Sequence, residues 1–217
     1  MSLSIRWQDV SGIERLGNAL GRLNSHEKHL VLQRAVNHTG DKARTKVIRA
    51  LAKQTGLGYG VIRNAVRTGN AWGAGADAST FREGRGSLTY VLSSKGGDIS
   101  LKFFKARETR PGVTAAPRGQ RQLYAGAFIK GGQFPNRVDA DGLNGHVYKR
   151  AGGKVKRVRG KSVGKRRQPL EFQDSGVIIP VEMLQGASAE AFTSTVNAEL
   201  PKRVMHEINR LCPGIFI

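Results

Sequence analysis

Cysteine and aromatic residues are scarce in this sequence. Cys212 is the single cysteine, which excludes a disulfide scaffold and any metal site built from several cysteines. Aromatic residues make up 6% of the chain, which argues against a protein that reads single strands by stacking bases on rings. No apolar run approaches the roughly 20 residues of a membrane span. The N-terminus also lacks the basic-then-apolar pattern of a secretion signal, so we expect no membrane anchor and no secretory route.

Acidic residues are few as well. The 217 residues include 16 Asp and Glu against 36 Lys and Arg, a formal charge of +20. Such an excess repels itself in a compact state, and solubility does not require so one-sided a balance. It therefore indicates a polyanionic or acidic partner, with nucleic acid first and membrane headgroups second. The length and the 39% hydrophobic content allow one domain with a real core.

Motifs of catalysis are missing too. The sequence has no paired-carboxylate, nucleophile-elbow, Walker or HExxH pattern. His26 and His29 could share a helix face, but a zinc site needs a further ligand nearby, so we favour surface or partly buried histidines. Cys212 has no histidine context that favours a nucleophile. We expect no enzyme, no metal and no cofactor, and a metal-dependent nuclease would have to collect carboxylates from remote positions.

The N-terminal third has helical periodicity, and we predict helices over 11–67. A break at Asn24-Ser25 is followed by a helix over 26–55 that ends at Gly56, and by a short helix over 61–67. Gly40 lies inside the long helix and weakens it by about 1 kcal/mol relative to Ala. Apolar or small side chains recur along the long helix at spacings of three and four residues: Leu32, Val36, Thr39, Ala43, Val47 and Leu51.

Alternating patterns follow. Residues 88–93 and 99–103 predict an antiparallel hairpin, and further strands are expected at 125–130, 147–150 and 176–179. Pro180 is expected to open a C-terminal helix over 180–211, with a kink or two consecutive helices at Pro201.

These elements predict an α+β fold, in which N-terminal helices and a C-terminal helix pack on an antiparallel sheet. We predict one domain over 1–217. Within it, 11–67 is the helical part, 87–179 is the sheet, and 180–211 is the C-terminal helix. Polar or glycine-rich stretches at 69–86, 106–122 and 149–167 are expected to extend as loops or arms.

The arm over 149–167 is the strongest candidate binding site. It combines ten basic residues with four glycines and no acid, which is the composition of a flexible segment that meets phosphates without reading bases. A solvated loop or a nuclear localisation signal would have a similar composition. The basic residues are Lys149, Arg150, Lys154, Lys156, Arg157, Arg159, Lys161, Lys165, Arg166 and Arg167.

A second basic set lies on the predicted helices. We slightly prefer to interpret it as an ordinary solvent-exposed face, although few acidic residues are near enough in sequence to pair with it. The set comprises Lys42, Arg44, Lys46, Arg49, Lys53, Arg63 and Arg67.

The order of several short motifs resembles the minor tail protein Z family of phages and prophages, the tail completion proteins of long-tailed phages. The resemblance covers residues 13–210, and the loop at 69–86, the stretch 106–122 and an insertion at 131–145 depart from it. The motifs are Ala35-Val36-Asn37 with its helix to Lys46, the basic helix Val61–Arg67, Gly126-Ala127-Phe128-Ile129, His146-Val147-Tyr148-Lys149-Arg150, and Ile179-Pro180-Val181 with the helix containing Leu200-Pro201-Lys202.

The resemblance implies a non-enzymatic structural protein at the head-proximal end of a virion tail, assembled in the host cytoplasm. It implies an α+β fold, a closed ring of subunits, and contacts to tail and head–tail connector proteins and to the genomic DNA backbone. An alternative is a free-standing basic protein that binds nucleic acid without sequence specificity. A nuclease is a weaker third.

Overall fold

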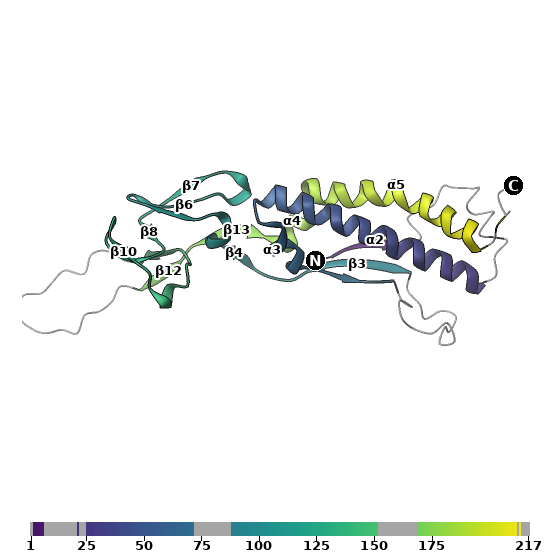
Figure 1. Ribbon diagram of the computed structural model, residues 1–217, viewed down its shortest axis with the longest axis horizontal. Coiled ribbons are helices and arrows are strands. Elements are labelled where there is room, and N and C mark those ends of the chain that lie inside the picture. Colours follow the sequence, from purple (N-terminus) through teal and green to yellow (C-terminus); the bar gives the residue numbers. More distant parts are fainter. Residues whose placement is uncertain are drawn as a thin grey trace, which may run out of the picture. The chain divides into compact units, whose positions relative to one another are not determined.

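The computed structural model describes residues 2–6, 21, 25–71, 88–151, 169–211 and 213 (Figure 1). It combines helices with antiparallel sheets, which confirms the predicted α+β class. The chain divides into two compact units. Unit 1 comprises Met1–Gln54, Tyr59–Gly96 and Ile179–Ile217, and unit 2 comprises Thr55–Gly58 and Gly97–Ile178. The prediction of one domain over 1–217 stays a prediction.

Unit 1 contains two long helices and a three-stranded antiparallel sheet in the order β1-β3-β2 (Figure 1). The helices α2 and α5 run in opposite directions, because Lys42 of α2 meets Glu199 of α5 while Gln54 meets Ser188. The elements are β1 (Ser2–Arg6), α2 (Ser25–Thr55), α3 (Tyr59–Ala65), β2 (Val66–Gly69), β3 (Thr89–Ser94), α4 (Ile179–Met183) and α5 (Gly186–Leu211).

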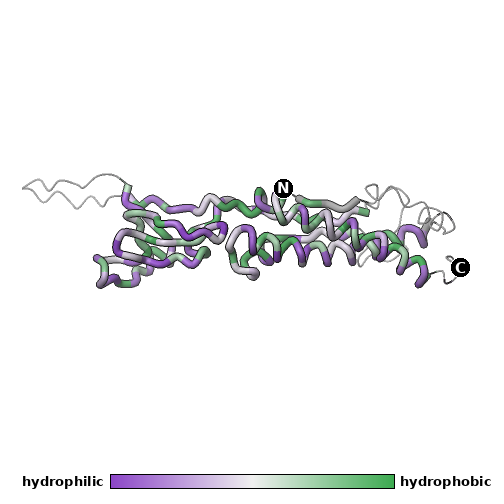
Figure 2. Tube along the Cα trace, turned by 90° about the horizontal axis from the view of Figure 1, so that it is seen from above, coloured by the Kyte–Doolittle hydropathy of each residue, from purple (hydrophilic) through white to green (hydrophobic). Residues whose placement is uncertain are grey.

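The long helix α2 confirms the sequence pattern. All six positions of the predicted stripe, from Leu32 to Leu51, are buried, because spacings of three and four residues keep them on one side of a helix. The turns of the long helices alternate between hydrophilic and hydrophobic colours in Figure 2. The helix ends at Thr55, and Gly56 follows with a φ of 78°, the left-handed conformation that glycine adopts most easily after a helix.

One prediction that involves β2 and β3 was wrong in its boundary, and a second was wrong in its strand pairing. The short helix predicted over 61–67 is α3, and Val66 and Arg67 instead begin β2, which pairs with β3. The predicted hairpin does not form, because β3 pairs with β1 and β2 while residues 101–104 form a 3-10 turn. Alternation identifies the two faces of a strand but carries no information about its partner. The strand β1 was not predicted at all.

Unit 2 is built from short antiparallel sheets. Their orders are β5-β6-β7, β12-β11-β8, β13-β4 and β10-β9. Three 3-10 turns connect them: η3 (Leu101–Phe104), η4 (Pro117–Gly119) and η5 (Asp141–Leu143). The strands are β4 (Asp98–Ser100), β5 (Arg107–Thr109), β6 (Gly112–Ala115), β7 (Gln122–Ala125), β8 (Ala127–Phe128), β9 (Gly131–Gly132), β10 (Arg137–Val138), β11 (Tyr148–Arg150), β12 (Leu170–Phe172) and β13 (Asp174–Ile178).

The stretch 106–122, predicted as an extended arm, folds into β5, β6 and η4. Val113 and Ala115 are fully buried in β6. β5 and β6 form a hairpin, and Gly112 lies at its turn. Only glycine fits there without a shift of the backbone, because a Cβ would lie 2.2 Å from the carbonyl oxygen of Tyr124. The sequence pattern did not predict the strand β6, because its side chains are small and alternate over only four residues.

The remaining strand predictions hold to different degrees. The strand expected at 147–150 is β11, and the one at 176–179 is β13, which begins two residues earlier. The single strand expected at 125–130 is divided at Gly126, whose φ of 73° separates β7 from β8. The arms predicted at 69–86 and 149–167 lie largely outside the described residues.

The C-terminal helix, expected to open at Pro180, begins one residue earlier at Ile179, and it divides at a different place. The short helix α4 ends at Met183, and α5 then continues through Pro201 as one element. Two consecutive helices meeting at Pro201 were therefore a wrong prediction, and the alternative, a kink there, stays a prediction. The hydroxyl of Ser188 donates to the carbonyl oxygens of Glu182 at 2.7 Å and Gln185 at 2.9 Å, which holds the turn between the two helices.

Candidate polyanion and partner interface

Of the ten predicted site residues, the structure describes Lys149 and Arg150. Both are exposed on β11, the central strand of the β12-β11-β8 sheet. Because successive strand residues point to opposite faces, Lys149 and Arg150 do not share one surface. The other eight predicted residues, Lys154, Lys156, Arg157, Arg159, Lys161, Lys165, Arg166 and Arg167, lie outside the described residues.

An aromatic row crosses one face of this sheet. The register places Tyr148 between Phe128 of β8 and Phe172 of β12. Tyr148 and Phe172 meet edge to face with ring centroids 5.6 Å apart. The Arg150 guanidinium lies 5.3 Å from the centroid of Phe128, a cation–π contact that positions the side chain, and within the described part of the chain no hydrogen bond or ion pair occupies its N–H groups. Arg150 can therefore bind an anion from an ordered position.

His146 connects the same sheet to β4 and η3. Its Nδ1 lies 2.8 Å from the Ser100 hydroxyl, and its Nε2 lies 3.0 Å from the Lys102 ammonium. Burial, and then the positive charge of Lys102, lower the pKa of His146. Since an ammonium only donates, Nε2 accepts and Nδ1–H donates to Ser100. A histidine in that tautomer cannot take the serine proton, so this pair is arranged for structure and not for nucleophilic attack.

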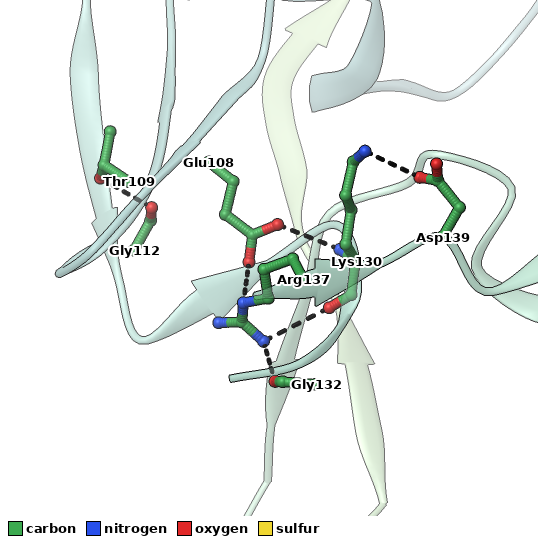
Figure 3. Close-up of polar contacts among 7 residues, drawn as sticks. All are labelled: Glu108, Thr109, Gly112, Lys130, Gly132, Arg137 and Asp139. Atoms are coloured by element: carbon green, nitrogen blue, oxygen red, sulfur yellow. Dashed lines mark hydrogen bonds and ion pairs between the residues drawn. The ribbon is translucent and has the colours of Figure 1, made fainter. Parts of the chain in front are cut away.

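A second cluster in unit 2 surrounds Glu108 (Figure 3). Arg137 of β10 places Nε 3.0 Å from one carboxylate oxygen of Glu108, and the backbone N–H of Lys130 donates to the other oxygen at 3.1 Å. Arg137 also donates to the carbonyl oxygens of Lys130 and Gly132. The Lys130 ammonium pairs with Asp139 at 3.0 Å.

The Glu108 cluster holds the hairpin formed by β9 and β10. That hairpin exposes Val138 by 68% and Phe134 by 44%. No sequence signal identified this cluster, because Glu108 and Arg137 are 29 positions apart and each resembles an ordinary surface charge.

The second basic set of the sequence separates into two kinds of residue. Arg44 is half-buried, and its guanidinium donates to the carbonyl oxygen of Val66 at 3.5 Å. The other six members are exposed, and among them Lys42 pairs with Glu199 at 2.7 Å. Arg44 thus stabilises unit 1, whereas the exposed members contribute to its surface charge.

A buried carboxylate lies on α5. The side chain of Glu207 is 1% exposed and pairs with Arg203 and with Arg210, the latter at 3.2 Å. These partners are four and three residues away along the same helix, so they neutralise the charge locally. The carboxylate is therefore part of the packing of α5.

Among the described residues, no group of three or more His, Cys, Asp or Glu side chains is placed to hold a metal ion. Within the same part of the chain, no helix is long and apolar enough to cross a membrane. Comparison with protein-family models, curated proteins and solved structures finds no match to this chain.

Proposed function

We propose that this protein is a structural tail completion or neck component of a long-tailed phage. The observation that carries the proposal is the order of the sequence motifs between Ala35 and Lys202. The structure describes residues of these motifs. Asn37 accepts a 2.7 Å hydrogen bond from the backbone N–H of Ala71, Gly126 separates β7 from β8, and Pro180 lies in the first turn of α4.

The proposed mechanism is assembly through contacts between subunits, without chemistry. Several copies of a chain carrying +20 would concentrate positive charge around a channel or on a docking face. Cations that face a channel attract the DNA backbone regardless of sequence. Cations that face outward would dock acidic surfaces of neighbouring tail or connector proteins, where complementary charge increases the association rate. The basic segment 154–167 is the proposed contact, and Arg150 is the described cation nearest to it in the sequence.

Complementation of a phage that lacks this gene tests the proposal. We expect the wild-type chain to restore tails that join heads, and a chain with all eight basic residues of 154–167 changed to Gln to leave heads and tails separate in electron micrographs. The matched control exchanges Lys and Arg at those eight positions, which preserves the charge and should restore joining. Normal particles assembled without the protein would overturn the proposal.

The second candidate function is a free-standing nucleic-acid-binding protein. The +20 charge favours it directly, since phosphate contacts need no particular fold. Mass measurement of the pure protein, with and without duplex DNA, separates the two functions. A tail completion protein should form rings or attach to tails. A chain that stays monomeric, binds duplex tightly at physiological salt and never associates with tails is the second candidate.

A further inference from the structure

The long helices of unit 1 carry a cationic surface that the proposed function does not use. Lys42, Lys46, Arg49 and Lys53 recur at intervals of three and four residues along α2, and all four are exposed. That spacing puts them on one face, one turn apart, over about 16 Å at 1.5 Å per residue. We define these four residues, together with Lys202 of α5, as the α2–α5 cationic patch.

The patch is poorly neutralised. Glu199 of α5 is the carboxylate that meets it: Lys42 pairs with Glu199 at 2.7 Å, and Lys46 and Lys202 also act on its charge, so that the pKa of Glu199 is lowered chiefly by the Lys42 bond. One carboxylate thus faces several ammonium groups. Among the described residues, no ion pair joins Lys46, Arg49 or Lys53 to any acid, including the exposed Glu190 of α5.

The remaining exposed side chains around the patch are polar. Thr193, Ser194 and Asn197 of α5 are exposed, and the hydroxyls of Thr193 and Ser194 donate to backbone carbonyl oxygens of their own helix. The large hydrophobic side chains that the described residues expose lie on other elements, and none belongs to α2 or α5. The ammonium and guanidinium groups of the patch match the donors that proteins use on phosphate oxygens.

The composition of the patch distinguishes between an acidic protein and a nucleic acid as its partner. Protein interfaces have an apolar core in which a few aromatic or aliphatic residues supply most of the binding energy. The patch has no such residue. A duplex presents one phosphate charge per roughly 1.7 Å of its axis and requires only positive charge and hydrogen-bond donors.

We propose that the α2–α5 cationic patch binds the phosphate backbone of duplex DNA without sequence preference. This is a second DNA-binding surface, on a rigid helix of unit 1, and it does not depend on the basic segment 154–167. Evenly spaced cations on a helix hold their positions before binding, so the association costs less conformational freedom than it does for a glycine-rich segment.

The test measures binding of a random-sequence duplex by fluorescence anisotropy at several salt concentrations. The test variant is K46Q/R49Q/K53Q, which removes the three cations that form no ion pair within the described part of the chain. The matched control is R63Q/R67Q/K95Q, which removes the same charge from exposed positions of α3, β2 and the residue after β3. Both are made in the full chain and in a chain whose 154–167 basic residues are Gln. Circular dichroism confirms that each variant retains its helices.

We expect the patch variant to weaken binding by about tenfold or more near 0.1 M salt and to flatten the salt slope by about 3, because three fewer phosphates are neutralised. The control should flatten the slope by less than about 1. Equal effects in both variants would mean that only net charge matters, and an unchanged slope in the patch variant would mean that DNA does not touch it; either result overturns the proposal. Polyglutamate binding that depends on the patch, with duplex binding that does not, would identify an acidic protein as the occupant and also overturn it.

Discussion

The ring of Tyr90 lies against Gly40 of α2, and the Tyr90 hydroxyl donates a 2.8 Å hydrogen bond to the carboxylate of Asp41, the next residue of the helix. A Cβ at Gly40 would come within 2.4 Å of the ring. The glycine that weakens the isolated helix is therefore what allows β3 to approach α2 closely. Burial, and then the bond to Asp41, raise the pKa of Tyr90 well above its ordinary value.

We predict that Gly40→Ala destabilises the protein. Alanine gains about 1 kcal/mol of helix propensity, but displacing a buried ring typically costs about 1–3 kcal/mol, so a net loss of up to about 2 kcal/mol is expected. Urea unfolding followed by circular dichroism measures it. Gly60→Ala in α3 is the matched control, since a Cβ there meets nothing within 4 Å, and it should be neutral or stabilising. Equal effects at both glycines would contradict the packing argument.

The lowered pKa of His146 predicts that the folded protein loses stability in mild acid. Its pKa in the folded protein lies below the ordinary 6.5 because of burial and Lys102, so the unfolded chain binds the proton more readily. The contribution of neutral His146 to the free energy of unfolding is complete above pH 6.5. It is lost as the pH falls through the pKa that His146 has in the folded protein. NMR titration of the imidazole checks the direction, and Lys102→Met should move that pKa upward. His29 and His38 are shifted in the same direction, so His146→Gln should remove only part of the acid sensitivity.

Arg137→Met should release the hairpin of β9 and β10. It leaves the Glu108 carboxylate, whose side chain is 10% exposed, without its charged partner, and that typically costs about 1–3 kcal/mol. Hydrogen exchange at the backbone amides of 130–138 should accelerate. Lys130→Gln removes an exposed pair with Asp139 and should change stability by less than about 1 kcal/mol. Unchanged exchange in Arg137→Met would show that the hairpin is held by other contacts.

Ser188→Ala should destabilise the turn between α4 and α5. The hydroxyl is buried and satisfies carbonyl oxygens at the end of α4, so stability should fall by about 1–2 kcal/mol. The comparison is Ser194→Ala, an exposed serine later in the same helix, which should be neutral or gain a few tenths of a kcal/mol from helix propensity. The midpoint temperatures of thermal unfolding measure the stability of the two variants. Similar midpoints in both would refute the role assigned to Ser188.

The candidate site was only partly predictable. Charge counting identified Lys149 and Arg150 as exposed cations, but the contact of Arg150 with the ring of Phe128 follows from the pairing of β11 with β8. The second basic set was treated as one surface, whereas Arg44 turns inward to the Val66 carbonyl and Lys46 and Arg49 remain exposed. Residue type reports charge, while access to that charge depends on which neighbouring element covers it.

The sequence by itself determined the periodic elements. The stripe from Leu32 to Leu51 required a long helix with one buried face, and Gly56 ended it, because both depend on residues close together in the chain. The amino-acid composition sets the formal charge of +20, and the acidic partner inferred from that charge stays a prediction. Only the tertiary structure decided which strands pair, why Gly40 is a glycine, and how Glu108 finds Arg137. Gly40 and Tyr90 are 50 positions apart, and Glu108 and Arg137 are 29 apart, so local pattern carries no information about these partners and packing selects them.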